Sequence, residues 1–127
     1  MSDASLRASV QKNEALKSKY QSVQNSIAWN GLSTKRGLAS ANALVDKCKD
    51  YLDKIDGNDG YGYLSNFRDK LSTDYETLKG YRDFVRDSNK AFMAMYEELG
   101  NHITALNSAI SRDKNAYNKG KKFWERI

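Results

Sequence analysis

The sequence predicts an all-α fold: an elongated antiparallel helical hairpin or bundle of three to four helices in a single domain, residues 1–127. Proline is absent from the whole chain, although it makes up about 5% of average proteins, and helix interiors exclude it. Hydrophobic residues form 39% of the chain and the mean hydropathy is −0.79, as expected of thin helices that each bury a single stripe. Apolar residues also recur at steps of three and four along most of the chain.

The first predicted helix spans residues 3–28, and Ser2 or Asp3 can cap its start. Its apolar stripe is interrupted at Asn13 and Lys17. The stripe consists of Leu6, Val10, Leu16, Tyr20, Val23 and Ile27.

The tripeptide Trp29-Asn30-Gly31 follows this helix directly. Gly31 can adopt the left-handed conformation that ends a helix, and asparagine is the next most tolerant residue type. We expect Trp29 to act as a large apolar plug at a corner where two antiparallel helices meet. Its truncation to alanine would then cost about 3–5 kcal/mol, whereas an exposed Trp29 would instead be a contact for a partner.

The second predicted helix spans residues 33–56, with Ser33 or Thr34 as its cap. The one cysteine, Cys48, excludes an intramolecular disulfide and is expected as a small buried side chain of the apolar stripe. That stripe comprises Leu38, Ala41, Leu44, Val45, Cys48, Tyr51, Leu52 and Ile55. The glycine-rich residues 56–62 are predicted to be a flexible connection. They lack the alternating ligands of a calcium loop and the preceding strand of a phosphate loop.

Two further helices are predicted over residues 63–99 and 101–126, with Gly100-Asn101 as the turn between them. One long kinked helix is the alternative, because the three-four spacing keeps its phase across Gly100. The stripe is rich in aromatic residues and is interpreted either as ordinary core or as a partner-binding face. The candidate partner-binding residues are Leu64, Phe67, Leu71, Tyr75, Leu78, Tyr81, Phe92, Met95 and Leu99.

Residues 112–127 carry most of the net charge of +5. The candidate basic aromatic tail consists of Lys119, Lys121, Lys122, Phe123, Trp124 and Arg126. The favoured interpretation is a cationic helix end that complements the helix dipole. An acidic protein partner comes next, and a membrane surface or nucleic acid is the least favoured.

No pattern in the chain predicts an enzyme, a cofactor or a metal site. The zinc-protease, serine-hydrolase and phosphate-loop motifs are all missing from the sequence. His102 is the only histidine and is expected on a helix surface or at an interface. No apolar run approaches the roughly 20 residues that span a bilayer, and residues 1–5 do not look like the start of a secretory signal peptide.

With helical stripes on both sides of Trp29-Asn30-Gly31, residues 3–56 resemble the WXG family of small helical-hairpin proteins, which bacterial type VII secretion systems export. The resemblance implies a homo- or heterodimer that binds a larger secreted helical effector, a toxin or the secretion ATPase. It also implies a place in the bacterial cytoplasm or export without a signal peptide. Some relatives encoded beside LXG toxins act as small helical targeting partners of the toxin.

The chain departs from the family in its export signal, Tyr-x-x-x-Asp/Glu after the second helix. Tyr96 is followed four residues later by Gly100, and Tyr117 by Lys121. We therefore expect a non-enzymatic helical module, a WXG-like partner or targeting chaperone for a type VII substrate. An unrelated cytoplasmic helical adaptor or structural coiled-coil protein is the alternative. A basic nucleic-acid or membrane-surface binder comes third.

Overall fold

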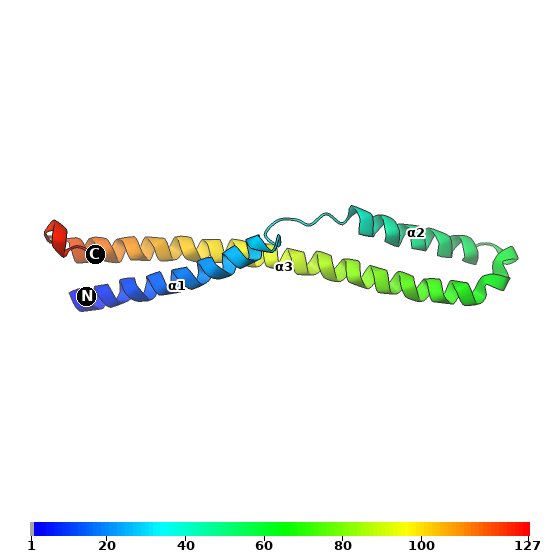
Figure 1. Cartoon of the computed structure of the whole chain (residues 1–127), viewed down its shortest axis with the longest axis horizontal. Coiled ribbons are helices and arrows are strands. Elements are labelled where there is room, and N and C mark those ends of the chain that lie inside the picture. The colour runs from blue at the N-terminus through cyan, green and yellow to red at the C-terminus, as the bar shows by residue number, and fades with distance from the viewer. Residues whose placement is uncertain (1) are drawn as a thin grey trace. The chain divides into compact units, whose positions relative to one another are not determined.

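The computed structural model describes residues 2–127 and confirms the all-α fold. Its elements, in order, are α1 (Asp3–Trp29), α2 (Ala39–Asp56), the 3₁₀ helix η1 (Asp59–Leu64), α3 (Ser65–Asn118) and the 3₁₀ helix η2 (Phe123–Glu125). The sequence predicts one domain; the structure divides into two compact units that share α3 (Figure 1). Unit 1 contains α1 and the part of α3 from Phe92 onward, and unit 2 contains residues 35–91.

Helix α3 is continuous over 54 residues, so the predicted turn at Gly100-Asn101 is wrong. A glycine inside a helix costs only about 1 kcal/mol, which packing along a continuous stripe can outweigh. The structure also gives Gly100 a packing role. A Cβ there would lie 3.2 Å from Nε2 of Gln24, and that amide donates a 3.2 Å hydrogen bond to the Tyr96 carbonyl. The missing side chain lets α1 approach α3 closely.

In unit 1, α1 runs antiparallel to the C-terminal part of α3 (Figure 1). The antiparallel order is visible in three contacts along α1. Lys121 Nζ lies 2.8 Å from an Asp3 carboxylate oxygen, and Lys114 Nζ lies 3.0 Å from Glu14. Further along, the rings of Tyr20 and His102 lie 5.7 Å apart between centroids. Each short helix thus pairs with part of α3, α1 in unit 1 and α2 in unit 2.

The face of α1 that packs against α3 includes polar residues. Asn13 and Lys17 are half-buried, because they continue the alternating steps of four and three that link Leu6, Val10 and Ile27. Asn13 and Lys17, which interrupt the apolar stripe in the sequence, therefore belong to the same packed face.

A buried carboxylate fixes the register of unit 1. Ser9 Oγ donates a 2.7 Å hydrogen bond to Oδ2 of Asp113, whose side chain is only 7% exposed. The Ser9 hydroxyl, together with Arg112 beside it, holds the pKa of Asp113 below its ordinary value. A shifted register would leave this buried charge without its partner, at a high energetic cost.

In unit 2, α2 packs against the first part of α3 through Val45 and Leu52. It begins at Ala39, so Ser33 and Thr34 are not its caps, and Leu38 takes the capping position without a side-chain hydrogen bond. The start of unit 2 is instead held by Asn89, which is 5% exposed. Its Oδ1 accepts a 2.8 Å hydrogen bond from the backbone N–H of Arg36.

The glycine-rich connection is held by defined contacts. Arg68 donates two hydrogen bonds, of 2.8 and 2.9 Å, to the carboxylate of Asp56 and so holds the pKa of Asp56 below its ordinary value. Asn58 caps η1 by accepting a 2.9 Å hydrogen bond from the Gly60 N–H. The prediction of a connection is confirmed, but its backbone is a capped 3₁₀ helix.

Gly31 ends α1 as predicted. Its φ is +69°, and the N–H groups of Leu32 and Gly31 donate 3.0 Å hydrogen bonds to the carbonyls of Ile27 and Ala28. This pair of bonds is the Schellman motif. At the other end of the chain, α3 stops at Asn118 rather than 126, and Gly120 follows with a φ of +76°.

The Ser9–Asp113 bond makes the stability of unit 1 depend on pH. Folding lowers the pKa of Asp113. The stabilisation by its ionised carboxylate is therefore complete above the ordinary pKa of 3.8 and is lost as the pH falls through the lowered pKa. We expect Ser9→Ala to lower the melting temperature at neutral pH and to matter less in acid. Thermal melts followed by circular dichroism across this range test this. Ser22→Ala, at an exposed position of α1, is the control; equal effects of the two changes would show that the bond contributes nothing.

Two glycines are expected to respond oppositely to alanine. A Cβ at Gly80 would point into open space in the middle of α3, so Gly80→Ala should stabilise the protein by about 1 kcal/mol. Gly31→Ala should destabilise it by about 1–2 kcal/mol, because Gly31 is left-handed. Urea unfolding curves measure both; a neutral Gly80→Ala would argue against a continuous helix in solution.

Candidate protein-binding surfaces

Large apolar side chains remain exposed on both units, because a pair of helices can bury only one face of each. In unit 2, four of them line one hollow, and in unit 1, two of them are consecutive on η2. The exposed set of unit 2 is Leu44, Tyr51, Tyr61, Tyr63, Phe67, Tyr81 and Phe84. That of unit 1 is Val23, Trp29, Phe92, Met95, Phe123 and Trp124.

The main hollow of unit 2, here called the α2–α3 groove, has a volume of about 520 Å³. One wall comes from α2, with apolar side chains at alternating steps of four and three, and the other comes from α3; Tyr61 and Leu64 of η1 also line it. The lining residues are Leu44, Lys47, Cys48, Tyr51, Lys54, Ile55, Tyr61, Leu64, Phe67 and Leu71. Two such parallel lines of side chains match the surface that a third helix packs against.

A second hollow of about 260 Å³ adjoins the groove at Leu44, which lines both. Its walls come again from α2, with the residues just before it, and from α3. They consist of Arg36, Gly37, Leu38, Ala41, Leu44, Val45, Leu78, Tyr81, Arg82 and Val85. Together the two hollows extend the apolar surface along α2.

The charged residues that line these hollows are all basic. Lys47 and Lys54 lie one heptad apart on the wall of the groove, and Arg36 and Arg82 line the second hollow. Among residues 2–127, no carboxylate lines either hollow, although Arg82 pairs at 3.0 Å with Asp83 beside it. The apolar surface therefore has a positively charged border.

The predicted partner-binding residues are divided between the two units. Leu64, Phe67 and Leu71 line the groove, Leu78 and Tyr81 line the second hollow, and Tyr75 is half-buried. The remaining three residues belong to unit 1, where Phe92 and Met95 are exposed and Leu99 is half-buried.

Sequence reasoning missed that α2 supplies half of the groove. The available signal was the adjacent apolar pairs Leu44-Val45 and Tyr51-Leu52, which widen the stripe beyond what one helix contact needs. In each pair the second residue is buried and the first is about half exposed. Cys48, expected as a small buried side chain, is half-buried and lines the groove.

Trp29 is not a plug. It is 91% exposed, whereas Ile27, two residues earlier, is 5% exposed and occupies the core position. Two residues correspond to about 200° around a helix, so Trp29 points away from the packed face. The residues around it, Ser22, Asn25, Ser26 and Asn30, are all uncharged and polar.

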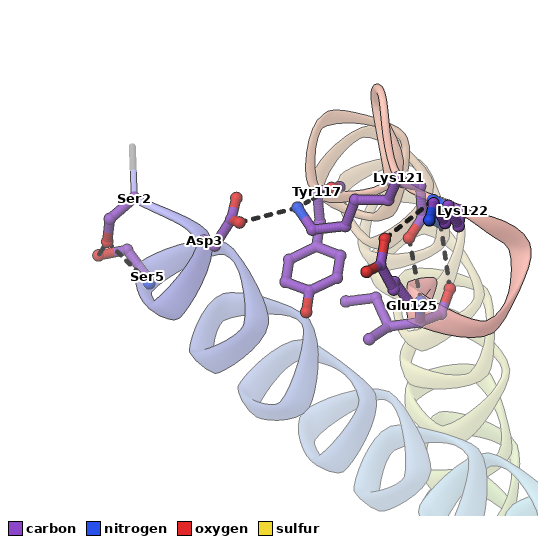
Figure 2. Close-up of polar contacts among 9 residues, drawn as sticks. Ser2, Asp3, Ser5, Tyr117, Lys121, Lys122 and Glu125 are labelled. Carbon is purple, nitrogen blue, oxygen red and sulfur yellow. Dashed lines mark hydrogen bonds and ion pairs between the residues drawn. The ribbon is translucent and has the colours of Figure 1, made fainter.

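The basic aromatic tail is not helical up to residue 126, so only part of it can act at the helix end. Lys121 does so: its ammonium group donates to the Tyr117 carbonyl at 2.6 Å and to Asp3 at 2.8 Å (Figure 2). It also lies 4.0 Å from the centroid of the Tyr117 ring. The tail residues Lys119, Lys122, Phe123, Trp124 and Arg126 all follow the end of α3.

Other predicted features are placed as follows. The His102 side chain is about half exposed, as predicted, and lies 3.6 Å from Glu98. Within the described residues 2–127, no group of three or more His, Cys, Asp or Glu side chains is arranged to bind a metal ion. In the same part of the chain, no helix is both long and apolar enough to cross a bilayer.

The position of Trp29 changes the expected effect of its removal. Trp29→Ala should leave the free energy of unfolding within about 0.5 kcal/mol of wild type, as for other exposed positions. Chemical denaturation followed by circular dichroism measures this. A loss near 3 kcal/mol, typical of a buried tryptophan, would show that Trp29 is packed in solution.

Comparison with known proteins gives no match to any family model, curated protein or solved structure. The resemblance of residues 3–56 to the WXG family rests on Trp29-Asn30-Gly31 and its flanking helices.

Proposed function

We propose that this chain is a helical binding module whose α2–α3 groove receives an amphipathic helix of a protein partner. The observation that carries the proposal is the apolar groove itself, about 520 Å³ in volume, between two helices. Phe67 and Tyr51, both about half exposed, flank it and would become buried under a third helix. Amphipathic helices bind other proteins through such apolar grooves.

The positive charge around the groove determines which kind of partner helix can bind there. Lys47 and Lys54 are one heptad apart, so they can pair with acidic residues spaced by one heptad on the partner. Because no carboxylate is among the described lining residues, these cations can attract an acidic partner and repel a basic one at the groove. The proposed occupant is therefore an amphipathic helix with acidic flanking positions.

The resemblance to the WXG family suggests the source of this helix. A larger helical substrate of a type VII secretion system would make the chain a targeting partner or chaperone of that substrate. A gene for an LXG-type toxin or for the secretion ATPase beside this one would support the proposal. A source genome without a type VII ATPase would contradict this assignment, and the chain would then be a helical adaptor of another system.

A designed peptide tests the groove directly. The peptide carries Leu at the a and d positions and Glu at the e and g positions; a matched peptide carries Lys in place of Glu. We expect the acidic peptide to bind more tightly in a fluorescence anisotropy titration. Phe67→Asp should weaken binding by about thirtyfold or more, the effect of losing a central apolar contact of about 2 kcal/mol.

The chain supplies a matched control for this variant. Phe84 is 69% exposed on the same helix but lines neither hollow. Phe84→Asp should therefore bind the peptide as wild type does. The double reversal Lys47→Glu, Lys54→Glu should transfer the preference to the basic peptide.

Three results would contradict the proposal. These are equal losses from Phe67→Asp and Phe84→Asp, equal binding of the two peptides, and a self-association that Phe67→Asp abolishes. The last result, measured by sedimentation, would identify a second copy of the chain as the occupant of the groove.

A further inference from the structure

A second surface, in unit 1, carries an independent inference. We propose that residues 119–127, the segment that contains the basic aromatic tail, dock on an anionic lipid surface. Phe123 and Trp124 enter the lipid interface, while Lys119, Lys122 and Arg126 face the headgroup phosphates.

The aromatic side chains of this segment contribute nothing to the core. Phe123 and Trp124 are adjacent on η2 and are 85% and 76% exposed. Two neighbouring aromatic rings on a solvent-facing turn keep a large apolar area in contact with water. Tryptophan is enriched where proteins meet the headgroup layer of a membrane, because its ring is apolar and its N–H is polar.

The turn that presents these rings is closed by several hydrogen bonds. Asn118 binds the backbone of Ile127 twice, donating to its oxygen at 3.2 Å and accepting from its N–H at 3.0 Å. Arg126 Nε donates to the Lys121 carbonyl at 3.2 Å. Because the turn is already ordered, docking loses little conformational entropy.

The charge of the segment complements an anionic surface. Lys121 is paired with Asp3, whereas Lys119, Lys122 and Arg126 form no ion pair with a carboxylate among residues 2–127. Glu125, the one acidic side chain of the segment, accepts a 3.0 Å hydrogen bond from the Lys122 backbone N–H (Figure 2). Lys122 Nζ also lies 5.4 Å from the Trp124 ring, so a cation and an aromatic group occupy the same site.

This arrangement favours lipid over nucleic acid. The cations are concentrated on one short turn, whereas proteins that bind nucleic acid place cations along the path of the phosphate backbone. The hollow that Ile127 lines contains a carboxylate and has no aromatic residue on which a base could stack; its other lining residues are Arg7, Val10, Gln11, Glu14 and Lys114.

Vesicle binding of the full chain tests the proposal. Trp29→Phe leaves Trp124 as the single tryptophan, so its emission should shift to the blue with vesicles of phosphatidylcholine and phosphatidylglycerol in equal parts. Pure phosphatidylcholine vesicles should give no shift, and added salt should reverse the binding. The double variant Phe123→Ser, Trp124→Ser should no longer sediment with the anionic vesicles. Lys122→Gln should weaken binding about fivefold, the effect expected for one cation near such a surface.

Trp29 provides the matched control, since it is even more exposed than Trp124 but has uncharged neighbours. Trp29→Ser should sediment with the vesicles as wild type does, and circular dichroism should show all variants folded. The proposal is overturned if wild type does not bind, if neutral vesicles bind equally well, or if Trp29→Ser weakens binding as much as the double variant. It is also overturned if single-stranded DNA displaces the vesicles and still binds the double variant.

Discussion

Helices α1 and α2 each bury their apolar face against α3, because a short amphipathic helix gains most of its stability from packing on another element. Helix α3 is therefore the element on which both units depend. Polar contacts fix the register along it: Ser9 with Asp113 in unit 1, and Arg36 with Asn89 in unit 2. Apolar stripes alone tolerate sliding by whole turns, whereas a buried carboxylate or amide must meet its own partner.

The exposed apolar surfaces follow from the same two-helix arrangement of each unit. A unit built from two helices has no third layer, so the flanks of its apolar stripes stay in contact with water. In unit 2 these flanks meet and form the α2–α3 groove; in unit 1 the most exposed apolar residues lie at Trp29, where α1 ends, and on the turn after α3. Exposed apolar patches of this kind on small proteins commonly mark interaction sites.

The helical period in the sequence predicted the all-α fold, as the glycine after the first helix predicted its left-handed end, because both depend on local geometry. It did not predict which helices pair. Residues 3–56 read as a hairpin around Trp29, but pairing depends on complementary stripes far apart in the chain, such as the faces that bring Ser9 to Asp113. The helix breaks were also misjudged, since the local preference of Gly100 is small compared with tertiary packing.

The candidate site was predicted in part for the same reason. Leu64, Phe67 and Leu71 were identified from their spacing on one helix, whereas the facing wall from Leu44 to Ile55 depends on the fold. The basic aromatic tail was recognised from composition, but its interpretation required knowing that α3 stops at Asn118. Composition reveals that cations and aromatic rings are close in sequence; only the structure reveals that the rings are unpacked.

The exposure of both tryptophans has a practical consequence for spectroscopy. Trp29 and Trp124, the two tryptophans of the chain, are 91% and 76% exposed in the folded protein. Their emission should therefore already resemble that of indole in water and change little when the chain unfolds. In this protein, intrinsic fluorescence is a poor probe of unfolding but a sensitive probe of any molecule that covers either indole.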